Sequence, residues 1–310
     1  MSNSGSYSQG HPLRNDLVMP DKPLPSLFFQ QEEFIFREGG SEVVTFSSPD
    51  QEARLYFTHS DNQLVSLRRS PFGGFVLNEL NPTSIRKVSQ QALDWAVAER
   101  VQSIVVHHYP DIYSPDASDL CREIMEEAGF EISYTDITQF ISVADARHLH
   151  LNTLRRRMLR KCIIKGLTFQ QLEPDKVKEV YPLFLESREN KGYPVTMTQE
   201  QLLTLFTKFP NNYLLFGVCD GTAVVAACIA IVVNADILYY FFTGDAHGYR
   251  DYSPVTLLIK GMYDYCIQHH FSILDLGIST DKGMLNEGLY AFKKSFGCID
   301  SDKITFKKTL

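Results

Sequence analysis

The stretch from residue 236 to residue 297 decides the fold of this chain. It reads ILYYFF, then TGDAHG, YRDYSP and SILDLG, and it closes on GLYAFKKSFG. The apolar runs at 237–242 and 272–277 predict strands, and Pro254 suits the first position of a helix between them. Residues 288–297 are predicted to lie in a closing helix. This alternation of strands and helices indicates a mixed α/β fold.

The residues before this stretch extend it into a sheet. Two near-continuous apolar runs, 213–219 and 223–233, flank the turn signal Asp220-Gly221 and predict a hairpin. Together with residues 237–242 they predict a three-stranded antiparallel meander. Two helices are expected before it, at 173–190 and 198–209.

The first part of the chain shows a similar alternation. Strands at 53–59 and 63–68 flank the turn Ser60-Asp-Asn62. The elements expected next are a helix from about Thr83, a strand at 103–109 ended by Pro110, a helix capped by Ser118 and running through Ala128, and a strand or hairpin at 131–143. Residues 1–25, rich in Ser, Gly, Asn and Pro, are expected to be a disordered lead-in.

The two halves repeat one order of elements. The strand that starts with SIVV at residue 103 corresponds to SILD at residue 272, and Gly129 of AGF corresponds to Gly297 of FGC. The two strands begin 169 residues apart and the two glycines lie 168 residues apart, and this common spacing indicates an internal duplication. We therefore expect two tandem domains, 26–147 and 148–310, with mixed, mostly antiparallel sheets flanked by helices. The ligand site is expected in the crevice between them.

Composition narrows the class of protein. The 310 residues are 44% hydrophobic with a net charge of −7, which argues against wholesale binding to nucleic acid but allows a local basic patch. The sequence has no apolar run of about 20 residues and no signal-peptide pattern, so the cytoplasm is the expected compartment. The six cysteines lack metal-binding spacing, so they are expected to be buried thiols, and no metal is expected.

The motifs of the 236–297 stretch also indicate a family. An aromatic strand, an Arg-x-x-Ser-Pro helix start, an Asp-Leu-Gly strand end and Gly-Leu-x-x-Phe-Lys-x-x-Phe-Gly together resemble the acyltransfer half of bacterial FemAB-like proteins, which are tandem versions of the GNAT N-acyltransferase fold. The resemblance implies transfer of an acyl or aminoacyl group to an amine, on a small molecule or a cell-wall precursor. It implies acyl-CoA or aminoacyl-tRNA as the donor. Two rivals stay open: a CoA-dependent N-acetyltransferase acting on a small amine, and a non-catalytic binding module.

Four residues are candidates for donor binding. GNAT enzymes hold the CoA pyrophosphate at a helix N-terminus, through a glycine-rich loop that begins with Arg or Gln. The matching stretch here runs from Arg250 to Pro254. The arginine is kept, but the glycines are replaced, and the proline lacks the backbone N–H that could donate a hydrogen bond to the pyrophosphate. Arg250 and Ser253 are therefore candidates, but the departure favours a FemAB-like donor over acetyl-CoA. Tyr240 and Phe292 are the other two, although aromatic residues of this kind are often core.

Lys293 and Asp275 are the candidates for catalysis. The resemblance implies that the Phe-Lys pair lines the acyl-donor site, where Lys293 can offset charge on a tetrahedral oxyanion. The alternative is a surface lysine at the end of a helix. Asp275 lies in an apolar strand, where burial would raise the pKa of its carboxyl and suit it as general base toward an amine. Alternatively, Asp275 ties down the following loop.

Four further residues are candidates for substrate binding. Gly277 leaves room for substrate atoms or simply permits a turn. Tyr239 can donate a hydrogen bond, or it belongs to the core of a central strand. Tyr109 ends the first-half strand that the repeat aligns with the strand of Asp275. Arg156 lies in the basic segment 148–166, which is either a solvated amphipathic helix or a clamp for phosphate groups, as a tRNA partner would require.

Overall fold

The computed structural model describes residues 24, 26–36, 43–67, 70–143, 149–190, 192 and 194–310. The predicted disordered lead-in, residues 1–25, lies outside the described residues except for Leu24. In the described part of the chain, strands and helices alternate in the predicted order, and the mixed α/β class is confirmed.

The strands build one long, mostly antiparallel sheet. Their bounds are β1 (Val43–Ser47), β2 (Ala53–Ser60), β3 (Gln63–Val65), β4 (Val76–Leu77), β5 (Ser103–His107), β6 (Glu131–Ser142), β7 (Thr168–Leu172), β8 (Tyr213–Asp220), β9 (Ala223–Val232), β10 (Ile237–Asp245), β11 (Ile273–Ile278), β12 (Thr280–Asp281), β13 (Met284–Leu285) and β14 (Ile299–Thr309). The order in the large sheet is β1-β2-β3-β5-β14-β6-β11-β10-β9-β8-β7, with β4 paired to β2. Only β3/β5 and β10/β11 are parallel among these pairs of described strands. Strands β12 and β13 form a separate hairpin.

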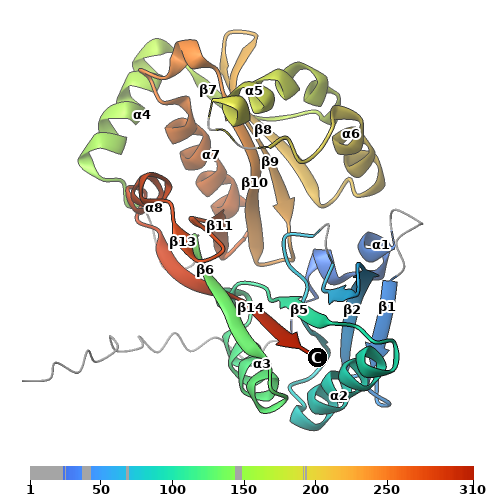
Figure 1. Ribbon diagram of the computed structural model, residues 1–310. Coiled ribbons are helices and arrows are strands. Elements are labelled where there is room, and N and C mark those ends of the chain that lie inside the picture. Colours follow the sequence, from blue (N-terminus) through green and yellow to red (C-terminus); the bar gives the residue numbers. More distant parts are fainter. Residues whose placement is uncertain are drawn as a thin grey trace, which may run out of the picture.

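The helices cover both faces of this sheet. Their bounds are α1 (Glu32–Ile35), α2 (Pro82–Ala98), α3 (Pro115–Glu127), α4 (Thr153–Lys165), α5 (Val177–Glu189), α6 (Gln199–Lys208), α7 (Pro254–Gln268) and α8 (Glu287–Lys294), with short 3₁₀ turns η1 (Phe28–Gln30), η2 (Asp111–Tyr113), η3 (Pro174–Lys176) and η4 (His247–Tyr249). Figure 1 shows α4 and α7 on one side of strands β8 to β10, and α5 and α6 on the other. Helices α2 and α3 lie together at the opposite end of the molecule.

Local sequence signals explain where most elements begin and end. The predicted meander is present as β8, β9 and β10, and Gly221 forms the hairpin turn with a φ of 61°. Helix α7 begins with Pro254 at its first position, as predicted. The prediction of Ser118 as a cap is wrong: α3 begins one turn earlier, with Ser114 at the N-cap and Pro115 at the first helical position. Proline fixes a helical φ there and needs no N–H partner, so it starts the helix.

Strands β6 and β14 carry the sheet from one half of the chain to the other (Figure 1). The C-terminal strand β14 pairs with the first-half strand β5 through residues 305–309. It also pairs along its length with β6, which in turn pairs with the second-half strand β11 through residues 138–142. Each half thus borders a strand from the other half. The two expected sheets are joined into one by this exchange.

The internal repeat is visible in backbone conformation. Strands β6 and β14 begin at residues 131 and 299, which are 168 residues apart. The glycines two residues before them, Gly129 and Gly297, have nearly the same left-handed φ, 76° and 78°. Equivalent turns therefore lead into the equivalent strands.

We expect Gly297→Ala to destabilise the fold more than Gly166→Ala. Both glycines have a positive φ, which costs an L-residue about 1–2 kcal/mol. A Cβ at Gly166 would meet nothing within 4 Å, whereas at Gly297 it would lie 2.8 Å from His150 Cβ and 2.9 Å from the His150 carbonyl oxygen. The expected losses in the free energy of unfolding are about 1 kcal/mol for Gly166 and about 2–4 kcal/mol for Gly297. Urea denaturation of both variants measures this difference, and equal losses would show that the His150 segment moves away freely.

Candidate active site

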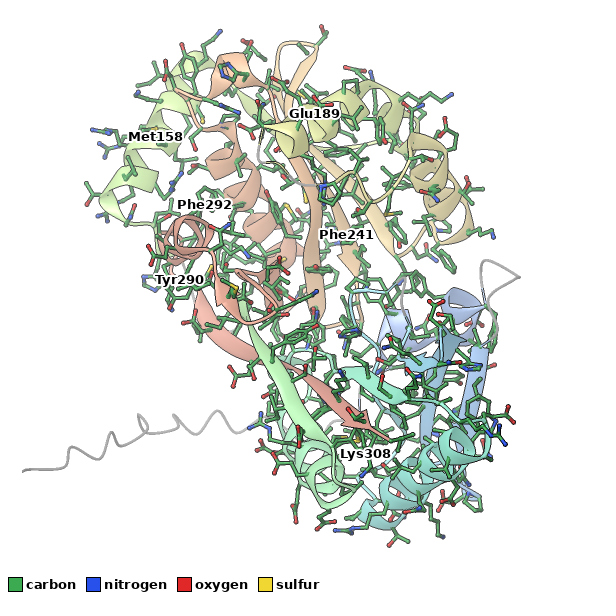
Figure 2. All side chains as sticks on the ribbon, viewed as in Figure 1. Met158, Glu189, Phe241, Tyr290, Phe292 and Lys308 are labelled. Carbon is green, nitrogen blue, oxygen red and sulfur yellow. The ribbon has the colours of Figure 1, made fainter. Side chains whose placement is uncertain are left out.

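A gap opens in the sheet between the parallel strands β10 and β11. The two strands pair only through residues 237–239 and 273–275, and the last pair is Tyr239 with Asp275. Beyond it β10 continues along β9, while β11 continues along β6. A register shift between Tyr240 and Phe242 leaves Phe241 as an extra residue, so β10 carries a bulge at this point. Figure 2 labels Phe241 on β10 near the middle of the molecule.

A cavity of about 1010 Å³ lies at this gap, and we call it the cleft cavity. One wall comes from β10, β11 and Lys303 of β14, and a second comes from α6 and the residues just before it. A third wall comes from the first half of the chain, as expected for a crevice between halves. The residues that line it include Pro71, Tyr113, Thr138, Glu200, Lys208, Tyr239, Phe241, Asp275, Gly277 and Lys303.

The first half has an equivalent gap, but its own backbone fills it. Strands β3 and β5 also pair in parallel through only three residues each. Beyond that point the Gly73 N–H donates to the His107 carbonyl at 2.8 Å. A Cβ at Gly73 would lie 2.8 Å from Ser66 Cβ, and one at Gly74 would lie 2.6 Å from His108 Nδ1. Only glycine allows this close approach, so the backbone at Gly73 and Gly74 packs into the gap beside β5.

Asp275 is the buried carboxylate at the point where the strands separate. Its side chain lines the cleft cavity, although the residue is only 1% exposed. One carboxylate oxygen accepts from the Tyr113 hydroxyl at 2.5 Å, and the other accepts from the Gly277 N–H at 2.7 Å and the Thr138 hydroxyl at 3.2 Å. Burial raises the pKa of Asp275, and these three hydrogen bonds oppose the rise. A carboxylate with a raised pKa is suited to accept a proton from an amine.

Lys293 holds the backbone that follows Asp275. Its ammonium donates to the Gly277 and Ile278 carbonyls, both at 2.7 Å, and the residue is 4% exposed. Burial lowers the pKa of Lys293 to about 8, while the charge of Asp275 acts in the opposite direction. The lysine is therefore neither a surface residue nor one of the residues that line the cleft cavity. In this structure it positions the turn that carries Gly277.

Tyr239 and Gly277 meet at the rim of the gap. Gly277 has a φ of 77°, and a Cβ there would lie 3.2 Å from the ring of Tyr239. Both line the cleft cavity with Asp275, so the structure brings together three of the predicted residues. Burial raises the pKa of Tyr239, so its hydroxyl is a neutral donor at physiological pH. Tyr240 points to the opposite face of the strand, where its hydroxyl donates to Thr243 at 2.7 Å.

The start of α7 forms a second group of polar residues. Arg155 of α4 donates to the hydroxyls of Ser295 at 2.9 Å, Ser253 at 3.1 Å and Thr256 at 3.3 Å. Its guanidinium also lies 4.6 Å from the centre of the Phe292 ring. We call these four polar residues the α7 N-terminal site. Among the described residues no carboxylate lies within ion-pair distance of Arg155, so the site has a positive charge next to a helix N-terminus.

The other predicted residues lie away from the cleft cavity. Arg250 is exposed in the turn before α7, and Arg156 is exposed on α4. Phe292 lies on α8 (Figure 2), and the guanidinium of Arg155 lies over its ring. Tyr109 is buried against His108, with ring centres 3.9 Å apart. These four positions do not meet in one place.

No pattern in the sequence marks Tyr113, Thr138 or Lys303 as a candidate. Tyr113 and Thr138 contact Asp275 from segments 162 and 137 residues away, and no local pattern marks such partners. Lys303 lies on β14, next to the closing motif but outside it. Arg155 belongs to the basic segment 148–166, one of whose two predicted roles is a clamp for phosphate groups, and its hydrogen bonds with Ser295 and Ser253 distinguish it from its neighbours.

The described residues show neither a metal-binding group of side chains nor a membrane-spanning helix. They contain no group of three or more His, Cys, Asp or Glu side chains arranged to bind a metal ion. No helix in the described ranges combines the length and the apolar character needed to cross a bilayer.

Comparisons with known proteins give a consistent result. Residues 152–294 match the family described as an acetyltransferase (GNAT) domain. The solved structure of FemX superimposes with a TM-score of 0.70 and 16% identity, covering 93% of this chain and 93% of that chain. The C-terminal domain of a proposed lysylphosphatidylglycerol synthetase from Agrobacterium fabrum gives 0.61 and 11%, covering 89% and 86%. L-PGS from Bacillus licheniformis gives 0.60 and 13%, covering 88% and 90%. No curated protein sequence matches significantly.

Proposed function

We propose that this chain, which matches a GNAT acetyltransferase domain over residues 152–294 and shares the fold of FemX, transfers an aminoacyl group from tRNA to an amine in the cleft cavity. The observation that carries the proposal is Asp275, a buried carboxylate with a raised pKa at the gap between β10 and β11. The predicted resemblance to this family is confirmed at the level of fold and domain. The donor, the acceptor and the roles of individual residues are our proposal.

The proposed reaction needs one base and one donor of hydrogen bonds. The amine nitrogen attacks the ester carbonyl carbon, and its proton passes to the Asp275 carboxylate. The carbon–oxygen bond to the tRNA ribose then breaks, and the released oxygen takes up the proton. The neutral hydroxyl of Tyr239 donates to the carbonyl oxygen as negative charge develops on it. Tyr113 and Thr138 hold the carboxylate in one orientation, which favours a fixed attack geometry.

The α7 N-terminal site favours a donor that carries phosphate groups. Arginine and a helix N-terminus are both suited to bind phosphate oxygens. Ser253 has a left-handed φ of 54° and Pro254 lacks an N–H, so the glycine-lined cradle for a CoA pyrophosphate is absent at this helix start. Helix α4 adds the exposed Arg156, Arg157, Arg160 and Lys161 beside the site. A long polyanion matches this strip of charge better than a compact cofactor does.

A second candidate is CoA-dependent N-acyl transfer. The observation that favours it is the match of residues 152–294, which include α4, α7 and α8, to an acetyltransferase domain family. In this case Arg155 and the three hydroxyls of the α7 N-terminal site would hold the pyrophosphate. The attack by the amine and the role of Asp275 are the same in both candidates.

We expect charged tRNA to bind the purified chain with strong salt dependence, and acetyl-CoA and a longer acyl-CoA to bind weakly. Calorimetry at two salt concentrations measures this. Arg155→Gln should weaken donor binding roughly tenfold, because a charge-assisted hydrogen bond contributes about 1.5–3 kcal/mol. Arg155→Lys keeps the charge and checks the fold, and Arg157→Gln should only lower the salt slope by about one unit.

Each result decides between the candidates. Saturable CoA binding without tRNA binding would favour CoA-dependent acyl transfer. If none of the three donors binds, the chain is a binding module without transferase activity. Equal effects of Arg155→Gln and Arg157→Gln would show that the α7 N-terminal site has no special part in donor binding.

A further inference from the structure

Lys303 supplies a positive charge to the cleft cavity from the C-terminal strand. It lies on β14 opposite Asp136 of β6, and its side chain lines the cavity. The ammonium donates to the Pro71 carbonyl at 2.7 Å, which leaves two of its three N–H groups. Burial lowers the pKa of Lys303, while the charges of Asp136 and Asp275 raise it.

The charge of Lys303 has no ion-pair partner among the residues that the structure describes. Two carboxylates act on its charge without forming an ion pair with it, those of Asp136 and Asp275, and both accept hydrogen bonds from other donors. The Oδ1 atom of Asp136 accepts both from the Thr280 hydroxyl at 2.7 Å and from the Gly283 N–H at 3.0 Å. Asp275 accepts from Tyr113, Thr138 and Gly277. A cation in a cavity without a counter-ion is a site for an anionic group of a ligand, because pairing offsets its cost of desolvation.

The position of Lys303 relative to Asp275 sets the shape of such a ligand. In the β6/β14 register Ser301 lies opposite Thr138, the residue that contacts Asp275, and Lys303 lies two residues further along. Residues two apart on a strand share a face and are separated by about 7 Å. The anionic group of the ligand and the group that faces Asp275 are therefore a few bonds apart. On the opposite wall, Glu200 and Lys208 belong to α6.

We propose that the acceptor carries a carboxylate as well as its reacting amine, as an amino acid or a short peptide does, and that Lys303 binds the carboxylate. This rests on the proposed function for the role of the amine, but the binding of the carboxylate is independent of any transfer step. On the wall formed by β14 the single ammonium of Lys303 balances one negative charge, and Lys208 lies on the opposite wall together with Glu200, so a carboxylate fits better at Lys303 than a doubly charged phosphate. Lys303 is thus the residue that selects the acceptor.

The test compares acids with their carboxamides. L-Alanine, L-lysine and L-alanyl-L-alanine, each paired with its C-terminal amide, are titrated into the full chain by calorimetry without a donor. At least one acid is expected to bind tenfold or more tightly than its amide. Lys303→Met should abolish this preference, and so should Lys303→Gln, which keeps a donor for Pro71 without the charge. Lys307→Met is the matched control, because Lys307 is an exposed lysine on the same strand.

Several results would overturn the proposal. They are no preference for any acid, a preference that survives both Lys303 variants, or tighter binding of phosphoethanolamine than of the acids. Failure of the proposed function looks different. A chain that binds an acid through Lys303 but never transfers an acyl group to it would overturn the transferase assignment alone.

Discussion

Asp275→Asn is expected to lower the rate of acyl transfer by about 10²–10⁴-fold, the usual contribution of a general base. Asparagine has nearly the same shape and can keep the hydrogen bonds with the Gly277 N–H and the Thr138 hydroxyl. It cannot accept the proton of the attacking amine. Because the carboxylate form is the base, the wild-type rate should fall as the pH drops through the pKa of Asp275, which burial raises above its ordinary value. The variant should lack this pH dependence.

Stability separates this effect from misfolding. A carboxyl with a raised pKa in the folded state binds its proton more tightly than in the unfolded chain, so its ionisation costs stability as the pH rises. Asp275→Asn removes that cost, and the variant should unfold at neutral pH no more easily than the wild type. The matched control is Asp136→Asn, which changes a second buried carboxylate that accepts from Thr280 and Gly283 and does not line the cleft cavity. A rate equal to that of the wild type in Asp275→Asn would remove the general base from the proposal.

Lys293→Met is expected to lower the free energy of unfolding by about 2–4 kcal/mol, because it leaves two buried carbonyl groups without a donor. These are the carbonyls of Gly277 and Ile278, which Lys293 now contacts at 2.7 Å. The turn after Asp275 would lose its anchor, so transfer should also slow. Urea denaturation and the transfer rate measure the two effects separately.

The neighbouring residue provides the control for Lys293. Lys294 is partly exposed and pairs with Asp300 at 3.0 Å, so Lys294→Met should cost less than about 1 kcal/mol. The pKa of Lys293 falls from its ordinary 10.5 to about 8 on folding, so the unfolded chain binds more protons between these values. Wild-type stability should therefore gain a contribution as the pH rises from 8 toward 10.5, and Lys293→Met should lack it. A variant that folds normally but cannot transfer would instead show the direct role at the acyl group that the family resemblance implies.

Many features of the fold follow from short stretches of sequence. The Asp220-Gly221 turn, the apolar runs around it and Pro254 at the start of α7 depend on residues that are neighbours in the chain. The duplication was visible in the spacing of Gly129 and Gly297, since equivalent turns keep equivalent glycines. The FemAB-like motifs pointed to the right fold for the same reason, because each motif marks the end of one strand or the start of one helix.

The cleft cavity depends on contacts between residues that are far apart in the sequence, which short stretches of sequence do not predict. Asp275, Gly277 and Tyr239 were identified from the motif and do line it, whereas Tyr109 and Arg156 do not. Asp275 has a hydroxyl partner, Tyr113, that is 162 residues away, and the last strand brings Lys303 next to Pro71, which is 232 residues away. Local patterns determine secondary structure because they depend on backbone preferences and on alternation of apolar side chains. The site depends on the exchange of β6 and β14 between the halves and on the close packing of Gly73 and Gly74, which are properties of the folded chain as a whole.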